Sequence, residues 1–124
     1  MPIVLVVDDE LAITDLLETI LTDEGYRVLT ACNGKQALAK MADATPDLIL
    51  LDFMMPILDG AGMLRAMAAA PSYQHIPVIM ISSLREEVIA QKCGGYAAFL
   101  RKPFRVAAVL KTVARVLGDE TKQC

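Results

Sequence analysis

The 124-residue sequence has few of the residues that build disulfide frameworks or histidine metal sites. Its three cysteines lie far apart, their number is odd, and no Cys-x-x-Cys pair occurs. This pattern favours free thiols in a reducing compartment, and the lack of a basic neighbour beside Cys32 or Cys124 argues against a redox sensor. The single histidine, His75, has no second imidazole with which to share a metal ion, so we expect it in a solvated loop.

Long apolar runs and an excess of basic residues are also absent. No stretch approaches the roughly 20 apolar residues that span a bilayer. The first apolar run, at residues 3–7, is too short for a signal peptide, and two aspartates follow it directly. The net charge of −3 argues against non-specific binding to nucleic acid or to an anionic membrane. We therefore expect a cytoplasmic protein that binds neither membranes nor nucleic acid directly.

Short apolar runs alternate with longer amphipathic segments along the whole chain. The apolar runs predict strands at 3–7, 27–31, 47–51, 77–81 and 97–100. The amphipathic segments predict helices near 11–23, 35–42, 61–70, 85–93 and 105–117. Five strand–helix units in this order predict one α/β domain, with a parallel sheet covered by helices on both faces. We assign residues 1–118 to that domain and 119–124 to a short polar tail, which favours a stand-alone protein.

Two of the predicted helices carry apolar stripes that should face the core. On the first, a helical wheel gathers Ile13, Leu16, Leu17, Ile20 and Leu21, with Thr14 on the opposite side. On the last, the stripe consists of Val106, Val109, Leu110, Val113, Val116 and Leu117. Four methionines also fall within elements that need core residues, namely Met41, Met63, Met67 and Met80. These side chains are the predicted core of the two helical layers.

Polar residues stand at the ends of four predicted strands. They are Asp8 and Asp9 after the first strand, Asp52 after the third, Ser82 after the fourth and Lys102 after the fifth. In such sheets, ligands bind beyond the carboxyl ends of the strands, where the strand order reverses. Each residue alone has a local explanation as a helix cap or a surface charge. Together they predict that three carboxylates, a hydroxyl and an ammonium converge on one rim.

This group of side chains has the chemistry of a phosphoryl-accepting site. Three neighbouring carboxylates repel one another unless a hard divalent cation joins them, and Mg²⁺ prefers such oxygen ligands. Phosphoryl transfer to a carboxylate requires positioning and the neutralisation of charge on the phosphoryl oxygens. A metal ion, the Lys102 ammonium and the Ser82 hydroxyl around Asp52 would supply both. An aspartyl phosphate on Asp52 is the covalent product that this set favours.

Four segments together resemble the signature of response-regulator receiver domains, the chemotaxis-regulator-like modules of two-component signal transduction. The segments are Val7-Asp8-Asp9, Asp52 to Gly60, Ile81-Ser82-Ser83 and Phe99 to Phe104, and they occur in the family's order. The similarity covers essentially the whole chain. It implies a flavodoxin-like (βα)5 fold with five parallel strands in the order 2-1-3-4-5. It also implies a cis peptide bond between Lys102 and Pro103.

The resemblance assigns a role to each residue of the rim. Asp52 is the expected phosphoacceptor. The expected Mg²⁺ ligands are Asp9, Asp8 through water, Asp52 itself and the backbone carbonyl of Met54. Ser82 and Lys102 would hold phosphoryl oxygens. Met54 and Leu84 would flank the approach of a hydrolytic water.

The resemblance also implies a phosphorelay function with protein partners. A histidine kinase or a histidine phosphotransfer protein would donate the phosphoryl group, and the domain would catalyse its own phosphorylation and dephosphorylation rather than act as an enzyme on other substrates. Ser82 and Phe99 would change the output surface, which binds a downstream protein or effector domain, when Asp52 is phosphorylated. A phosphorylation-dependent dimer is compatible with this switch. The segment between Ser82 and Lys102 is shorter than the usual family spacing. The way in which relatives bind their partners or dimerise is therefore not assumed for this chain.

Three alternatives start from the same residues. A phosphatase of the haloacid-dehalogenase type also forms an aspartyl phosphate, but it needs a second Asp where Met54 stands. A flavin-binding module would need a phosphate loop where this chain has Asp8-Asp9-Glu10, whose charges repel a flavin phosphate. A degenerate receiver that no longer accepts phosphate would lack one of the chemical positions, and here all of them are filled.

Overall fold

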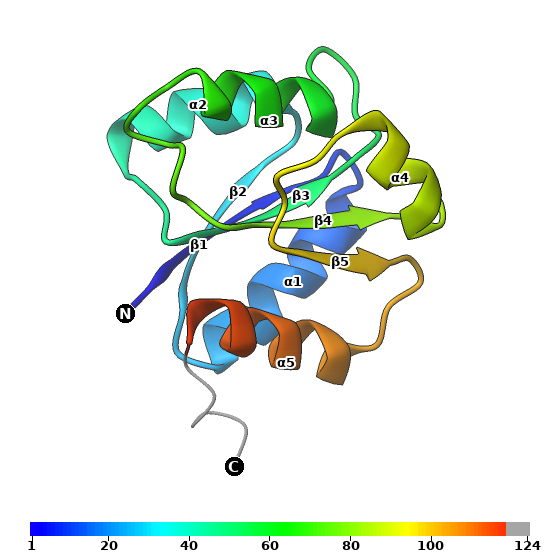
Figure 1. Ribbon diagram of the computed structural model, residues 1–124. Coiled ribbons are helices and arrows are strands. Elements are labelled where there is room, and N and C mark those ends of the chain that lie inside the picture. Colours follow the sequence, from blue (N-terminus) through cyan, green and yellow to red (C-terminus); the bar gives the residue numbers. More distant parts are fainter. Residues whose placement is uncertain (119–124) are drawn as a thin grey trace.

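The computed structural model describes residues 1–118 as a five-stranded parallel sheet between two layers of helices (Figure 1). The strands are β1 (Ile3–Val7), β2 (Arg27–Ala31), β3 (Leu48–Asp52), β4 (Val78–Ser82) and β5 (Ala98–Arg101). The helices are α1 (Leu11–Asp23), α2 (Gly34–Asp43), α3 (Gly60–Ala68), α4 (Glu86–Lys92) and α5 (Val106–Leu117). All ten elements lie within two residues of the predicted bounds. The predicted polar tail, 119–124, lies outside the described residues.

The strand order is β2-β1-β3-β4-β5, and every pair is parallel. This is the flavodoxin-like order that the resemblance to receiver domains implies, and the structure confirms it. Because the chain moves from β1 outward to β2 and then crosses to β3 on the other side, the strand order reverses between β1 and β3. The carboxyl ends of β1, β3 and β4 therefore meet at one rim, where a ligand has access from outside the sheet.

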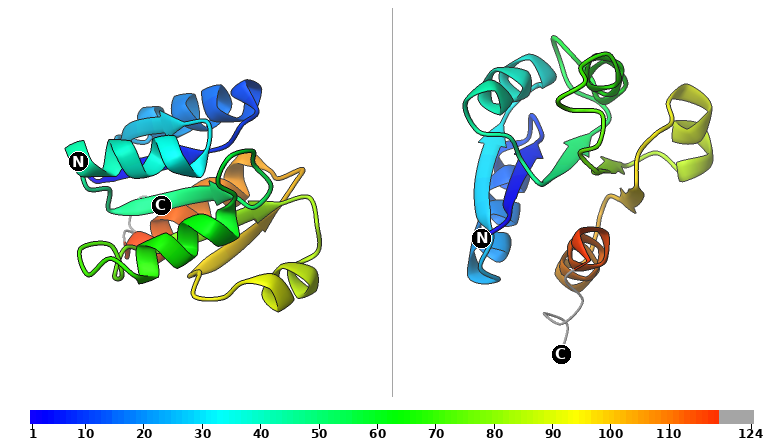
Figure 2. Two further views of the ribbon diagram at one scale, coloured as in Figure 1. Left: turned by 90° about the horizontal axis from the view of Figure 1, so that it is seen from above. Right: turned by 60° about the vertical axis from the view of Figure 1, so that its left-hand side comes forward.

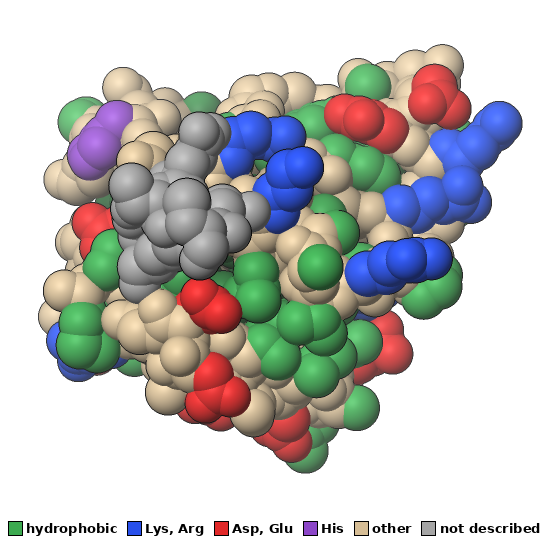
Figure 3. All heavy atoms as spheres, turned by 90° about the horizontal axis from the view of Figure 1, so that it is seen from below, with side chains coloured by type: hydrophobic (Ala, Val, Ile, Leu, Met, Phe, Trp, Pro, Cys, Tyr) green, Lys and Arg blue, Asp and Glu red, His purple; other side chains and the backbone are tan. Residues whose placement is uncertain are grey.

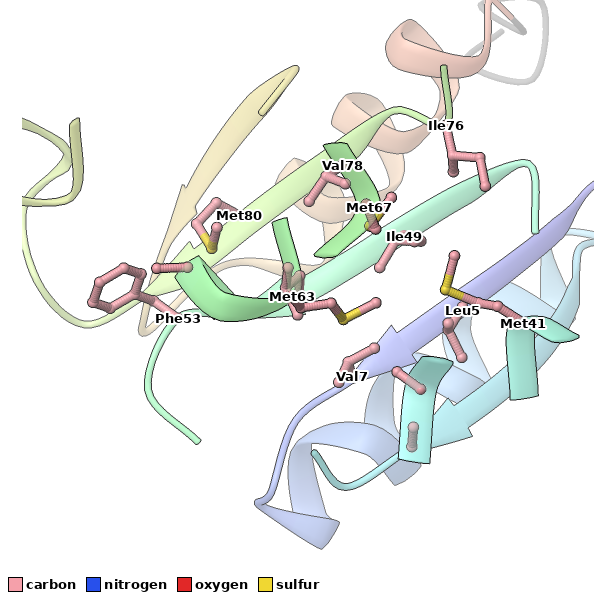
Figure 4. Close-up of a cluster of buried hydrophobic side chains, with 14 of the residues drawn as sticks. Leu5, Val7, Met41, Ile49, Phe53, Met63, Met67, Ile76, Val78 and Met80 are labelled. Carbon is pink, nitrogen blue, oxygen red and sulfur yellow. The ribbon is translucent and has the colours of Figure 1, made fainter. Parts of the chain in front are cut away.

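The two faces of the sheet carry separate apolar cores because side chains alternate along each strand. On one face, Leu5, Val7 and Ile49 pack with residues of α2, α3 and α4 (Figure 4). On the other, Val4, Val6 and Leu50 pack with α1 and α5. Figures 1 and 2 show this division, with α1 and α5 on one side of the sheet and α2, α3 and α4 on the other. The four methionines predicted as core are all buried: Met41, Met63, Met67 and Met80.

Two apolar residues and one polar residue depart from the predicted helix faces. Leu16 on α1 and Val106 on α5 are 41% and 40% exposed, although both belong to the predicted core stripes. Thr14, which the helical wheel turns to solvent, is buried, and its hydroxyl donates to the Leu11 carbonyl at 3.0 Å. That hydrogen bond satisfies the polar group locally, so its burial has a low cost. These three predictions are wrong because periodicity gives the direction of a side chain but not the element that covers it.

Several smaller expectations concern the loops. The Lys102–Pro103 peptide bond is cis, as predicted. His75 is exposed in the segment between α3 and β4, as expected. Burial raises the pKa of the Cys93 thiol, so the reactive thiolate form of Cys93 is less favourable. Among residues 1–118, no helix has the length and apolar character needed to cross a membrane.

Candidate functional site

Backbone hydrogen bonds between neighbouring strands hold the rim together beyond the strand ends. The Phe53 N–H donates to the Ile81 carbonyl at 2.9 Å, which fixes β3 against β4 just past Asp52. The Lys102 N–H donates to the Ser82 carbonyl at 2.8 Å, which fixes the residue after β5 against the end of β4. These two hydrogen bonds fix the residues that follow β3 and β5 relative to the end of β4.

These side chains surround a hollow of about 290 Å³, which we call the acidic pocket. Its lining consists of Asp9, Glu10, Asp52, Met54, Ser82, Ser83 and Lys102. Asp8 lies beneath it and is 2% exposed, and Asp52 is 4% exposed. Asp9 is exposed at the mouth. The pocket thus has a buried acidic floor and an open acidic edge.

Lys102 is the centre of the ionic contacts in the pocket. Its Nζ lies 2.8 Å from Asp8 Oδ2, 3.0 Å from Glu10 Oε1 and 3.5 Å from Asp52 Oδ1. Burial acts to lower the pKa of Lys102, but the contacts with Asp8 and Glu10 and the charge of Asp52 outweigh it and raise that pKa above its usual value. The ammonium is therefore permanently charged and is shared among three carboxylates.

One cation does not balance the negative charge around Asp52. Burial and, after it, the neighbouring charge of Asp8 raise the pKa of the Asp52 carboxyl from 3.8 to about 7, although the contact with Lys102 acts in the opposite direction. A carboxyl with such a pKa is destabilised as the anion. The arrangement therefore favours the arrival of additional positive charge.

The donor atoms present fit a divalent metal ion. Asp8, Asp9 and Asp52 each offer one carboxylate oxygen, and these oxygens lie within 4.8 Å of one another. Within residues 1–118, Asp8 Oδ2 is the buried side-chain oxygen that accepts no hydrogen bond, and the Lys102 ammonium 2.8 Å away balances its charge only in part, because that ammonium also contacts Glu10 and Asp52. An all-oxygen set of this kind suits Mg²⁺.

The loop between β3 and α3, residues 53–59, contributes Met54 to one wall of the pocket and is tightly packed. Its ends are joined by a hydrogen bond from the Gly60 N–H to the Phe53 carbonyl at 2.9 Å. A Cβ on Gly60 would lie 2.8 Å from the Asp52 carbonyl oxygen, so only glycine fits against the end of β3. The loop turns at Ile57, whose φ of 71° is rare for a β-branched residue and is held by a hydrogen bond from Leu58 N–H to Pro56 O at 2.8 Å.

Ser82 is buried with its hydroxyl oriented by the next loop. Its Oγ accepts a hydrogen bond from the Leu84 N–H at 3.0 Å. A hydroxyl that accepts in this way keeps its own proton for another acceptor, such as a phosphoryl oxygen in the pocket. Phe99 lies apart from the acidic pocket, half-buried against the apolar core that the sheet forms with α2, α3 and α4, with its ring centroid 6.5 Å from that of Tyr96.

A second, larger hollow of about 510 Å³ adjoins this wall. Met54 lines both hollows, whereas Leu84 lines only the larger one. Met54 is 61% exposed, so its side chain stands at the border between the acidic pocket and solvent.

Comparison with known proteins assigns the chain to a family. The model of the response regulator receiver domain matches residues 4–114, which include all of the acidic pocket and the five strands apart from Ile3. The chain belongs to the response regulator receiver domain family. Its receiver fold and its place in two-component signalling follow from that membership.

The relatives of this receiver domain include full-length regulators and single domains. Response regulator PleD of Caulobacter vibrioides is 46% identical over 102 residues, which cover 81% of this chain and 22% of PleD. The chain therefore spans about a fifth of the length of that relative. Chemotaxis response regulator CheY4 of Vibrio cholerae superposes with a TM-score of 0.87 at 35% identity, covering 94% of this chain and 98% of that one.

Another solved relative is the receiver domain of a sensor histidine kinase from Pseudomonas aeruginosa. It superposes with a TM-score of 0.87 at 28% identity, covering 94% of this chain and 98% of that one. That protein was crystallised with a magnesium ion coordinated in its active-site cleft.

The fold brings together the residues predicted for phosphoryl transfer and metal binding, with one addition, whereas Phe99 and Leu84 lie outside the acidic pocket. Asp8, Asp9, Asp52, Ser82, Lys102 and Met54 all border or underlie the acidic pocket. Glu10 is the addition: its carboxylate takes up part of the Lys102 ammonium, and sequence analysis assigned it no part in the site. Its position directly after Asp8 and Asp9, before the first turn of α1, could have indicated this role, because an acid there lies at the same rim of the sheet.

Proposed function

We propose that this receiver domain accepts a phosphoryl group on Asp52 from a phospho-histidine donor in a Mg²⁺-dependent reaction. The observation that carries the proposal is the convergence of Asp52, Lys102 and Ser82 with two further carboxylates in one pocket. The magnesium-containing relative supports the choice of metal. Asp8, Asp9, Asp52 and the Met54 carbonyl would hold the ion, whose charge would neutralise the carboxylates and the phosphoryl oxygens.

The reaction is a displacement at phosphorus. A carboxylate oxygen of Asp52 attacks the phosphorus atom, and the new P–O bond forms as the P–N bond to the donor imidazole breaks. The imidazole nitrogen keeps the electron pair. The Lys102 ammonium can stabilise the negative charge on the transferred phosphoryl group. It already lies 3.5 Å from Asp52 Oδ1 and can exchange a carboxylate partner for a phosphoryl oxygen. The Ser82 hydroxyl donates its free proton to another phosphoryl oxygen.

The same contacts provide the switch that we propose. The phosphoryl group favours a new conformation only through contacts that differ between the two states, here those with Ser82 and Lys102. Drawing Ser82 toward the pocket vacates space on the side of β4 that faces Phe99, which is half-buried and free to repack. Rotation of Phe99 would then alter the surface formed by α4 and β5.

The chemistry of the pocket disfavours the alternative functions. Met54 stands where a haloacid-dehalogenase phosphatase needs its general acid, and a thioether cannot donate a proton. The acidic edge formed by Asp9 and Glu10 would repel the phosphate of a flavin. The proposed donors are a histidine kinase or a phosphotransfer protein.

The switch is tested by NMR with beryllofluoride, which mimics the phosphoryl group when Mg²⁺ is present. In the wild type, amide shifts should change around Asp52 and also around Phe99 and α4. In Ser82→Ala, the changes near Asp52 should remain and those near Phe99 should be lost. Ser83→Ala is the matched control, because Ser83 is an exposed neighbour. Shifts beyond the pocket that are the same in Ser82→Ala and in the wild type would refute the switch.

A further inference from the structure

The seven methionines of the chain differ greatly in their access to solvent. Four of them belong to the apolar core beside α2, α3 and α4 and are at most 3% exposed: Met41, Met63, Met67 and Met80. Met55 is half-buried against the same core. Met1 and Met54 are 87% and 61% exposed. A thioether is therefore most accessible at Met1 and Met54.

Of these two residues, Met54 lies at the acidic pocket. It lines both that pocket and the larger hollow of about 510 Å³ beside it. Met1 precedes β1 at the amino edge of the sheet, whereas the pocket lies at the carboxyl ends of the strands (Figure 1). A small molecule from solvent can therefore reach Met54 through the larger hollow, and a chemical change of Met54 alters the border of the pocket around Asp52.

Exposure of an apolar side chain is common and does not by itself indicate a function. Hydrophobic side chains also reach the surface elsewhere, for example on the side of the molecule where α5 lies (Figure 3). Methionine differs from the other apolar residues because its thioether can be oxidised to a sulfoxide, which turns an apolar group into a polar one. Met54 thus combines a chemically convertible side chain with a position at the border of the acidic pocket.

A sulfoxide is compatible with the fold at this position. A polar group lowers stability when it is buried without a hydrogen bond, as it would be at the four core methionines. At Met54 the sulfoxide oxygen would remain in contact with water, because the residue is largely exposed. Oxidation also leaves the backbone carbonyl of Met54 unchanged. It should therefore alter the acidic pocket without unfolding the protein.

We propose that Met54 is an oxidation site, where hydrogen peroxide converts the thioether to a sulfoxide and thereby shortens the lifetime of the phosphoryl group on Asp52. A lone pair of the sulfur attacks one peroxide oxygen, and the S–O bond forms as the O–O bond breaks. The sulfur loses two electrons, and the departing hydroxide takes the proton of the attacked oxygen and leaves as water. A methionine sulfoxide reductase would restore the thioether.

The effect on the lifetime rests on the proposed phosphorylation of Asp52. Hydrolysis needs a water in line with the bond between phosphorus and the Asp52 oxygen, and a thioether offers that water only a weak hydrogen-bond acceptor. A sulfoxide oxygen is a strong acceptor. At the border of the acidic pocket it can hold the water through one proton and leave a lone pair free to attack phosphorus. Oxidation should therefore accelerate dephosphorylation.

The first measurement maps the oxidation. The whole, unphosphorylated protein is treated with limited hydrogen peroxide and then with dithiothreitol, which reverses sulfenic acids and disulfides at the cysteines but leaves sulfoxides. Peptide mass spectrometry should find sulfoxide first at Met1 and Met54, later at Met55, and at the four core methionines only after denaturation. Circular dichroism verifies that the oxidised protein is folded. Oxidation of Met54 no earlier than that of the core methionines would overturn the assignment of the site.

The second measurement compares phosphate release with and without prior peroxide treatment, using protein phosphorylated by acetyl phosphate and Mg²⁺. In the wild type and in Met1→Leu, oxidation should speed release by about three- to tenfold, and methionine sulfoxide reductase should reverse the change. Met54→Leu lacks the sulfur but keeps Met1 and the three cysteines, so its rate should be the same with and without peroxide. Equal acceleration in Met54→Leu, or none in the wild type, would overturn the inference.

The two measurements separate this inference from the proposed function. A protein that acetyl phosphate does not label on Asp52 would contradict the proposed function, and with it the effect on the lifetime. The peptide map would still decide whether Met54 is an oxidation site. A labelled Asp52 whose lifetime does not respond to oxidation of Met54 would contradict the inference alone.

Discussion

Leu58, in the loop beside Asp52, lies directly over Gly34, the first residue of α2. The Gly34 N–H donates to the Leu58 carbonyl at 3.0 Å. A Cβ on Gly34 would lie 2.8 Å from that oxygen and 2.9 Å from Leu58 Cγ. On its other side, Leu58 Cδ1 would lie 2.6 Å from a Cβ on Gly62. The loop that carries Met54 is therefore held between the first turns of α2 and α3.

The first prediction follows from that packing. Gly34→Ala should lower the free energy of unfolding by about 1–3 kcal/mol, because the added methyl group overpacks the contact with Leu58. Gly94→Ala is the matched control: a Cβ there meets no atom within 4 Å, and the same substitution should be neutral or slightly stabilising. Urea unfolding of the two variants measures the difference. Equal free energies of unfolding for Gly34→Ala and Gly94→Ala would show that Leu58 moves aside without loss of stability.

The second prediction concerns pH and stability without metal. Because folding raises the pKa of Asp52 from 3.8 to about 7, the folded state retains a proton that the unfolded state releases. The free energy of unfolding should therefore fall as pH rises from about 4 to about 7, by on the order of 1–2 kcal/mol after allowance for solvent at the rim. In the presence of EDTA, Asp52→Asn should remove this part of the pH dependence.

The control for the pH experiment is Asp43→Asn on the exposed end of α2, which should keep the wild-type slope. Denaturant unfolding at several pH values gives the free energies. A pH profile for Asp52→Asn that parallels that of the wild type would mean that the Asp52 carboxyl is not destabilised by its burial.

The third prediction concerns Glu10, which shares Lys102 with the buried acids at 3.0 Å. Glu10→Ala should speed phosphorylation by a small-molecule donor, by about two- to fivefold. The change frees the ammonium and removes a negative charge from the path of an anionic donor. Glu18→Ala, farther along α1 and exposed, removes the same charge away from the pocket. If the two variants react at the same rate, Glu10 has no specific influence on Lys102.

The fourth prediction concerns how long the phosphoryl group persists. Met54 is apolar and borders the acidic pocket, so we expect that it holds no hydrolytic water by hydrogen bonding and that its side chain obstructs the water's approach. We expect slow autodephosphorylation. Met54→Asn should accelerate it by about tenfold, equivalent to one hydrogen bond of about 1.4 kcal/mol in the transition state.

Met54→Leu is the matched control for the lifetime, because it keeps an apolar side chain of similar volume and should remain slow. Phosphate release from the purified phosphoprotein gives the rates. A Met54→Asn variant no faster than Met54→Leu would show that this side chain does not set the lifetime.

Much of this structure could be predicted from the sequence because its signals are local. Each strand is a short apolar run, and Asp8, Asp52, Ser82 and Lys102 stand at the strand ends, so the topology alone brings them together. The contact of Leu58 with Gly34 could not be predicted in the same way, since it joins distant segments that meet only after folding.

Burial within the helices was harder to predict. Leu16 and Val106 belong to apolar stripes, yet no described neighbour covers them enough to bury them. Thr14 can be buried at low cost because its hydroxyl donates a hydrogen bond to the Leu11 carbonyl within the helix. A helical wheel contains neither kind of information. The ion pair of Glu10 with Lys102 was also not predicted. It depends on the position of the Lys102 ammonium in the folded protein, which a sequence pattern does not contain.

The most direct test of the central claim is the site of phosphorylation. Wild-type protein, Asp52→Asn and Asp9→Asn are incubated with acetyl phosphate and Mg²⁺ and weighed by intact-mass spectrometry. We expect one phosphoryl group on the wild type, none on Asp52→Asn, and loss of the label when EDTA replaces Mg²⁺. Asp9→Asn keeps the acceptor but weakens the metal site, so it should be labelled only at raised Mg²⁺ concentration. Equal labelling of Asp52→Asn and the wild type would contradict the assignment of Asp52 as the phosphoacceptor.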